Sequence, residues 1–173
     1  MKIIHNKIPH YYKGPAMIFW VFYVIRDYAW TLKKIHSPYI DKLNNFIEDS
    51  NKFEKMSGPY EIVFGHNDLL AANILDDGKK LWIIDWEYAG FNSPLFDLGG
   101  LASNNGLTED KENFMLEEYF GHKITSNLKN KYQAMKCASL LRELMWSMVS
   151  EITSNIEFDF KKYTKENFDR YKI

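Results

Sequence analysis

Three polar residues near the middle of the 173-residue chain have the right types to transfer a phosphoryl group. Asp68 lies five residues before Asn73, and Asp85 ends an apolar run that follows a polar turn. A carboxylate and an amide oxygen can share one Mg²⁺, a hard ion that prefers oxygen ligands and phosphates. An acid beside that ion can accept the proton of an attacking hydroxyl. We therefore expect Asp68 to be a base beside a magnesium site made by Asn73 and Asp85.

A β-hairpin is the element that would bring these side chains together. Apolar runs lie on either side of the polar turn 76–80. That turn contains an Asp-Gly pair, which is a strong hairpin signal. A turn centred on Lys79 places Asn73 opposite Asp85, with the two side chains about 5 Å apart across the ladder. Asp68 would then lie on the loop that enters the first strand.

The rest of the chain must form the scaffold for this hairpin, and most of it has helical periodicity. A short strand is expected over 61–65 and a loop over 86–94, while Ser57-Gly58-Pro59 should end the second helix. The predicted fold class is therefore α+β and mainly α-helical, with one small hairpin inside a helical body. The predicted helices cover residues 16–35, 39–55, 109–120, 126–154 and 163–171.

Composition narrows the classes of partner. Apolar residues make up 46% of the chain, enough for a sizeable core in one domain. With 22 basic and 23 acidic residues, the chain has no field that would attract nucleic acid or an anionic membrane. The apolar run 16–25 is about half of what a bilayer-spanning helix needs. A single cysteine, Cys137, fits a reducing compartment, and we expect a cytoplasmic protein.

Two motifs at fixed mutual spacing resemble a known family. The pattern His66-x-Asp68-x-x-x-x-Asn73, followed by Ile83-Ile84-Asp85-Trp86-Glu87-Tyr88-Ala89-Gly90, is similar to the choline/ethanolamine kinases and aminoglycoside phosphotransferases, relatives of the protein kinases. Segments 140–149 and 156–163 resemble the choline-kinase branch. The likeness implies that residues 1–173 form a single domain, the C-terminal lobe of a protein-kinase-like phosphotransferase with a small catalytic hairpin.

The resemblance also implies an activity. It would be ATP- and Mg²⁺-dependent phosphoryl transfer to the hydroxyl of choline or a similar amino alcohol. Ethanolamine, thiamine and an aminoglycoside are the other acceptors to consider. In this family pattern Asp68 takes the role of catalytic base, and Asn73 and Asp85 take the magnesium roles.

Further residues are assigned by the same resemblance. Trp146 and Tyr163 match positions where aromatic rings surround a quaternary ammonium, which cannot donate N–H hydrogen bonds and is held by aromatic faces. Trp146 also suits a buried core position. Glu143 lies one helical turn from Trp146 and could supply a negative charge to that pocket. Glu87 could contact substrate, reach the metal through water or brace its loop.

Two residues are expected to support the catalytic loop. His66 is interpreted as a hydrogen-bonding brace, and Asp97 as a carboxylate that fastens the loop by accepting hydrogen bonds. A third reading, a metal-dependent hydrolase with His66 and Asp68 as ligands, needs more ligands than these motifs supply.

The start of the chain departs from the family pattern. Only about 65 residues precede the motif, and Gly14 stands alone where a glycine-rich phosphate loop on a strand would be expected. The nucleotide-binding N-terminal lobe is therefore expected to be absent from this sequence. One alternative is that the chain is a non-catalytic fragment or pseudoenzyme that binds a ligand or partner. Another is that it pairs with a separate N-terminal lobe or with itself.

Overall fold

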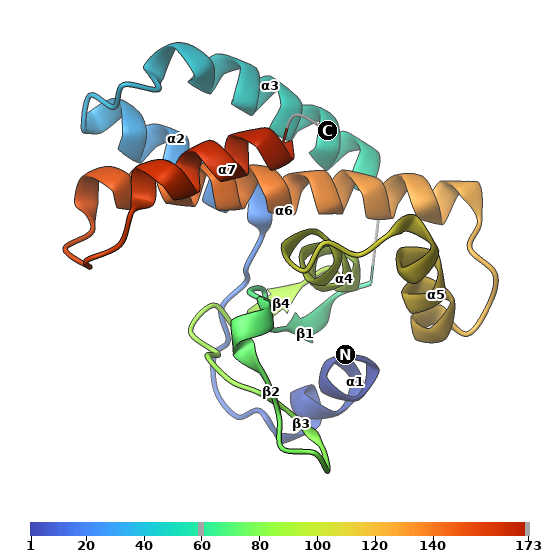
Figure 1. Ribbon diagram of the computed structural model, residues 1–173. Helices are drawn as coiled ribbons and strands as arrows, with labels where there is room; N and C mark the ends of the chain where they lie inside the picture. The colour runs from blue at the N-terminus through green and yellow to red at the C-terminus, as the bar shows by residue number, and fades with distance from the viewer. Residues whose placement is uncertain (59–60, 172–173) are drawn as a thin grey trace.

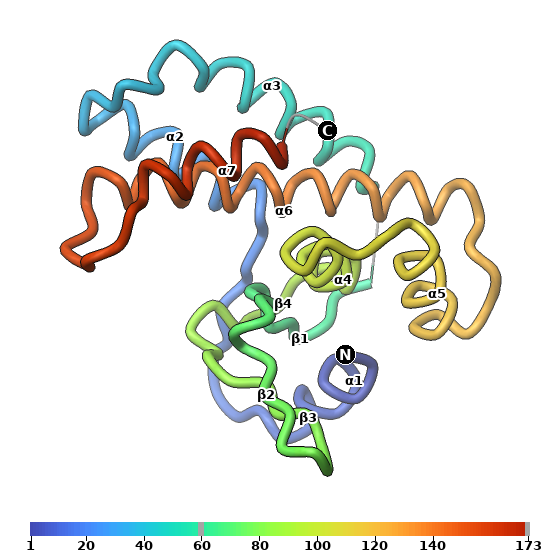
Figure 2. The backbone as a smooth tube through the Cα atoms, in the orientation of Figure 1, coloured from blue at the N-terminus to red at the C-terminus, as the bar shows by residue number. Residues whose placement is uncertain are grey.

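One long helix organises the molecule. The computed structural model describes residues 1–58 and 61–171. Helix α6, Ser126–Thr153, runs across the centre of the molecule (Figure 1). Along one side of it lie α2 (Val21–Lys34), α3 (Ile40–Ser57) and α7 (Phe160–Tyr171), and along the other α4 (Pro94–Asn104) and α5 (Glu109–Phe120). The smoothed backbone in Figure 2 shows α7 running back along α6.

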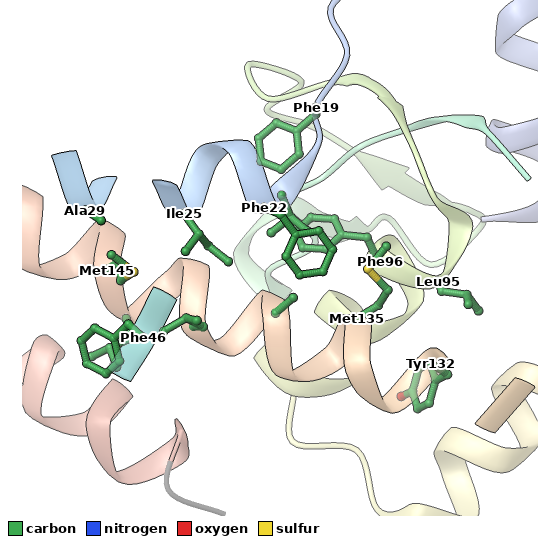
Figure 3. Close-up of a cluster of buried hydrophobic side chains, with 14 of the residues drawn as sticks. Phe19, Phe22, Ile25, Ala29, Phe46, Leu95, Phe96, Tyr132, Met135 and Met145 are labelled. Atoms are coloured by element: carbon green, nitrogen blue, oxygen red, sulfur yellow. The ribbon is translucent and has the colours of Figure 1, made fainter. Parts of the chain in front are cut away.

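The core lies where α2, α4 and α6 meet. Phe22 and Ile25 of α2, Phe96 of α4 and Met135 of α6 are buried, and all four belong to one apolar cluster (Figure 3). Phe19 packs onto Phe96 with ring centroids 5.6 Å apart. Because the stripe of α6 from residue 132 to residue 148 is buried in this cluster, the helix is held rigidly beside the loop that carries Asp68.

Two small antiparallel sheets complete the fold. Strand β1 (Val63–Gly65) pairs with β4 (Gly90–Asn92). Strand β2 (Ile74–Asp76) pairs with β3 (Leu81–Ile83), and a 3₁₀ turn, Ala71–Asn73, leads into β2. The predicted class, mainly helical with a small hairpin, is confirmed. No helix in the described part of the chain is long and apolar enough to cross a membrane.

The hairpin register differs from the expected one by a single residue. Ile74 faces Ile83, and the Ile84 amide donates to the Asn73 carbonyl at 3.0 Å. Asn73 is therefore opposite Ile84, and the expectation that it faces Asp85 is wrong. The cause is the turn, which centres between Gly78 and Lys79 rather than on Lys79. Gly78 has φ +78°, which only glycine adopts without strain.

Other element boundaries also needed correction. Residues 17–19 are extended instead of helical, because the Phe91 amide donates to the Met17 carbonyl at 2.8 Å and the Phe19 amide to the Phe91 carbonyl at 2.9 Å. Helix α2 therefore begins only at Val21. The predicted loop 86–94 contains β4, and α7 begins three residues before the predicted start.

Two findings concern the N-terminal half of the chain. Helix α1, Lys2–Tyr11, packs against β1 and has no counterpart among the predicted elements. The predicted stop of the second helix is partly described: Ser57 is the last helical residue and Gly58 follows at φ +56°. Pro59 lies outside the described residues.

Candidate functional site

The loop that carries Asp68 is fixed by one buried carboxylate. Asp97, near the start of α4, is 2% exposed. Its Oδ2 accepts a hydrogen bond from the His66 amide at 2.8 Å, and its Oδ1 accepts one from the Asn67 amide at 2.7 Å. Two charge-assisted bonds to consecutive amides hold the backbone immediately before Asp68 in one conformation.

A histidine that sequence reasoning did not assign to the site completes this anchor. His5 of α1 is buried, with Nε2 2.9 Å from Asp97 Oδ2 and Nδ1 2.7 Å from the Tyr119 hydroxyl. Burial, with the charges of Glu61 and Asp97, raises the pKa of Tyr119 to about 12, so its hydroxyl stays protonated at neutral pH. Nothing in the spacing of His5 links it to Asp97, which lies 92 residues later.

His66 joins the same loop to the strand that leads to Asp85. Its Nε2 lies 2.8 Å from the Ile84 carbonyl and therefore donates to it. Nδ1 is then the acceptor of a 3.3 Å bond from the Asp68 amide. The ring packs edge-on against Trp86 at 4.8 Å. The two loops that carry the predicted base and the predicted metal ligand are thus tied together through one imidazole.

The two predicted magnesium ligands lie on either side of Ile84. Asn73 donates from Nδ2 to the Asp68 carbonyl at 3.0 Å, which leaves its amide oxygen as the acceptor. Asp85 is exposed and has φ +61°, a left-handed conformation that costs free energy for a residue other than glycine. An amide oxygen and a carboxylate suit a hard divalent cation.

The predicted magnesium ligands are a pair of oxygen donors and not a cluster of protein ligands alone. Among residues 1–58 and 61–171, no three or more His, Cys, Asp or Glu side chains are grouped so as to hold a metal ion. An asparagine and a single aspartate, with phosphate oxygens completing the shell, fall outside that kind of cluster. The chemistry of this pair therefore fits magnesium bound together with a nucleotide.

The Asp68 carboxylate is held from α6. Arg142 donates from Nη2 to Asp68 Oδ1 at 2.9 Å and to the Asn67 carbonyl at 2.9 Å, and from Nη1 to Glu143 Oε2 at 2.8 Å. Burial alone would lower the pKa of Arg142, but Glu143 and Asp68 together raise it above its ordinary value. Sequence reasoning missed Arg142, although its position beside Glu143 within the family-like segment 140–149 was a usable signal.

Glu143 connects this ion pair to the aromatic residues. Its Oε1 accepts a hydrogen bond of 2.7 Å from the Tyr163 hydroxyl. Burial first, and then the Glu143 charge, raise the pKa of that phenol, so it remains a donor at neutral pH. The Tyr163 ring packs edge-on against Trp146 with centroids 6.3 Å apart. Glu143 and Trp146 of α6 thus lie together with Tyr163 of α7, as predicted for the three residues.

These side chains line a cavity of about 390 Å³. Asp68 lies in its wall together with the three residues just described. Glu87 and Asp85 are not part of this wall, and both are exposed. Glu87 is the sequence neighbour of Tyr88, which does line the cavity, and its contact with a substrate stays a prediction. The cavity is lined by Asp68, Leu70, Tyr88, Arg142, Glu143, Trp146, Ile156, Glu157, Phe158, Phe160 and Tyr163.

Three of the aromatic lining residues were not predicted. Phe158 lies 5.7 Å from the Tyr163 ring, and Phe160 lies 6.0 Å from Trp146, both edge-on. Tyr88 lies beneath the guanidinium of Arg142, 5.5 Å from its ring centroid. Phe158 and Phe160 belong to the family-like segment 156–163, which could have indicated them.

Comparisons with known proteins identify the family of the chain. Residues 20–135 match the family model described as choline/ethanolamine kinase. The chain belongs to the choline/ethanolamine kinase family. The recognition made from the two motifs is thereby confirmed.

The chain matches only part of the length of individual members of the choline/ethanolamine kinase family. It is 34% identical over 129 residues to a probable ethanolamine kinase A of Dictyostelium discoideum, and 28% identical over 109 residues to protein LicA of Haemophilus influenzae. These matches cover 64% and 60% of the chain but only 37% and 40% of the relatives. A choline/ethanolamine kinase family protein of Mesorhizobium loti superposes with a TM-score of 0.83 at 25% identity, covering 99% of this chain and 58% of that one.

Proposed function

We propose that this chain carries the acceptor-binding and catalytic part of an enzyme that phosphorylates an amino alcohol with ATP. The single observation that supports this most strongly is the cavity. It places the Asp68 carboxylate in the same wall as Trp146 and Tyr163, so one small molecule could reach both an acid and an aromatic cage. A chain of about six atoms with an ammonium at one end and a hydroxyl at the other fits such a volume.

The proton chemistry follows from the contacts of Asp68. Its Oδ1 is held by Arg142, and Oδ2 is the oxygen left to accept a proton. As the acceptor hydroxyl attacks the γ-phosphorus of ATP, the O–H proton passes to Asp68 Oδ2 and the bond to the β-phosphate oxygen breaks. Asp68 makes the acceptor oxygen more nucleophilic, and the cavity supplies the orientation.

Magnesium is the cofactor that the remaining residues suit. Asn73 and Asp85 would hold it, with Glu87 near enough in sequence to act through water. The ion would neutralise charge that develops on the phosphate oxygens. The chain's own contribution is to fix the segment between these ligands, through the bonds that Ile84 makes to Asn73 and to His66.

The acceptor that the cavity suits best is a quaternary ammonium such as choline. Both Glu143 oxygens are already bonded, one to Arg142 and one to Tyr163. A primary ammonium such as that of ethanolamine would have to compete with these donors to satisfy its N–H groups. A trimethylammonium group has no N–H and needs only charge and aromatic faces. We therefore rank choline above ethanolamine, thiamine and aminoglycosides.

The hairpin on the nucleotide side offers a surface for a further partner. The hairpin exposes Leu75, Leu81 and Trp82 by 49%, 66% and 47%. Apolar residues so exposed on a short two-stranded hairpin are a candidate contact for an N-terminal lobe that would cover ATP. The same exposure also supports the second candidate function, a non-catalytic chain that binds a ligand or a partner but transfers nothing.

A transfer assay separates these two functions. The purified chain is incubated with ATP, Mg²⁺ and choline, and phosphocholine is detected by ³¹P NMR, while calorimetry measures nucleotide binding. Formation of phosphocholine that needs Mg²⁺ and disappears in Asp68→Asn would support the kinase. Choline binding without nucleotide binding or product would favour the non-catalytic function. Ethanolamine and an aminoglycoside, tested in parallel, rank the acceptors.

A further inference from the structure

Arg142 is a buried cation in the wall of the cavity, and the proton transfer proposed above uses only its bond to Asp68 Oδ1. Its side chain is 5% exposed, and it lies between the carboxylates of Asp68 and Glu143. A charge is taken out of water at high cost unless opposite charges and hydrogen bonds compensate for it. Here one guanidinium serves both carboxylates, so the three side chains form a single charged unit.

The geometry of the guanidinium fixes the direction of the Asp68 carboxylate. One nitrogen, Nη2, donates to both Asp68 Oδ1 and the carbonyl of Asn67, at 2.9 Å each. The carboxylate is therefore held relative to the backbone that carries it. The other nitrogen, Nη1, holds Glu143, whose second oxygen is bonded to Tyr163. A planar fork can make these bonds together, whereas a lysine ammonium cannot match them.

The unit also sets the charge of the cavity. Asp68, Arg142 and Glu143 together leave one net negative charge against the aromatic wall, which is the complement of one ammonium. The third lining carboxylate, Glu157, is exposed, so solvent and salt screen its charge. We propose that Arg142 is a positioning residue with two effects: it aims Asp68 at the acceptor hydroxyl, and it cancels the charge of one of the two carboxylates that it contacts, so that the cavity suits a single ammonium. This inference rests on the proposed function, because it names the device that serves the same site.

A purely structural role and a charge-balancing role for Arg142 predict opposite changes in cation binding. If Arg142 only supported the fold, its loss would weaken cation binding and phosphoryl transfer together. If it balances charge, its loss leaves a more negative cavity, in which an incoming ammonium supplies the missing counter-charge. Binding and catalysis should then change in opposite directions.

Three variants test this difference. Calorimetry with choline and with tetramethylammonium should show about tenfold tighter binding to Arg142→Met, while phosphocholine formation falls by about a hundredfold or more. The double variant Arg142→Met/Glu143→Gln restores the wild-type net charge and should return the affinity to the wild-type value. Arg142→Lys keeps the charge but not the fork, so the KM for choline should stay unchanged while kcat falls about tenfold.

A matched control lies on the same helix. Lys136→Met removes a cation that pairs with Glu112 at 2.5 Å and does not line this cavity, so it should leave choline affinity and transfer unchanged. Weaker cation binding in a folded Arg142→Met protein, or an unchanged kcat in Arg142→Lys, would overturn the inference. Where Arg142→Met does not fold, Arg142→Lys decides alone. If the unaltered chain transfers no phosphate yet the affinities change as expected, the charge role stands and the proposed reaction fails.

Discussion

The two sides of the loop that carries Asp68 differ in how firmly hydrogen bonds and packing hold their side chains. On the side of α6 and α7, Asp68, Arg142, Glu143 and Tyr163 are linked by hydrogen bonds of 2.7–2.9 Å around a cavity. On the hairpin side, β2 and β3 have three residues each and Asp85 is exposed. The α6 half, where we propose that the acceptor binds, is therefore preorganised by the core, whereas the hairpin half, where we propose that the phosphates bind, depends on a short hairpin. Preorganisation needs a packed helix behind the site, and only the α6 half has one.

The largest effect should come from the residue shared by both halves. Asp68→Asn keeps the shape of the side chain but removes the proton acceptor, so phosphoryl transfer should fall by about a thousandfold. The measurement is phosphocholine formation at saturating choline. Asp41→Asn, at an exposed position in the first turn of α3, is the control and should transfer normally. Activity that survives in Asp68→Asn would show that another group takes the proton.

The comparison also predicts different stabilities. Phe96→Ala in the core beside α6 should lower the free energy of unfolding by about 3–5 kcal/mol, because it leaves a cavity. Leu81→Ala in the hairpin, 66% exposed, should lower it by about 0.5 kcal/mol or less. Denaturant unfolding measures both. Comparable losses at the two positions would mean that the hairpin is packed in solution against something that covers it.

The hairpin side should respond to magnesium and the helical side should not. Asp85→Asn should weaken nucleotide binding measured in the presence of Mg²⁺ by about tenfold or more, because one of the two oxygen ligands loses its charge. Choline affinity should be unaltered. Asp76→Asn, at the end of β2, is the matched control. An equal loss of choline affinity in Asp85→Asn would contradict the separation of the two halves.

The aromatic residues should set the preference for choline over ethanolamine. Trp146→Ala removes a ring from the cage and should weaken choline binding by about tenfold, with a smaller effect on ethanolamine. Calorimetry with both ligands gives the ratio. Exposed Trp30→Ala on α2 serves as the control for loss of a tryptophan. If both ligands weaken equally, Trp146 has only its alternative role in packing.

The smallest effect is a shift in that preference. Tyr163→Phe keeps the ring but releases Glu143 Oε1, which can then accept a hydrogen bond from a primary ammonium. Ethanolamine affinity should rise by about threefold while choline affinity changes little. The ratio of the two dissociation constants is the measurement, and Tyr39→Phe, whose hydroxyl bonds Glu151, is the control. If the affinity rises for neither ligand, the result would argue against competition for Glu143.

The sequence predicted the helices better than it predicted the contacts between residues that lie far apart in the chain. The stripe on 126–154 predicted α6 because apolar spacing directly reflects burial. The one-residue error in the hairpin arose because its register depends on which residues occupy the turn, and Gly78 allows a tighter turn than one centred on Lys79. The start of α2 was missed because the backbone of residues 17–19 pairs with Phe91, a partner that no local pattern reveals.

The candidate site shows the same limit. The two motifs named Asp68, Asn73 and Asp85, and the family-like segments named Trp146 and Tyr163. Arg142 was overlooked because a single arginine in a helix is ordinary, and its meaning appears only when Asp68 is seen beside it. His5 and Asp97 are likewise joined only by the fold, which brings α1 against the catalytic loop.

Nuclear Overhauser measurements on the chain with choline test the central claim most directly. The cavity account predicts contacts from the N-methyl protons to the ring protons of Trp146 and Tyr163, and from the CH₂–OH end to the loop at Asp68. Tetramethylammonium should reproduce the ring contacts and displace choline. Contacts of the N-methyl protons with the hairpin or with α1, and none with these two rings, would contradict the account.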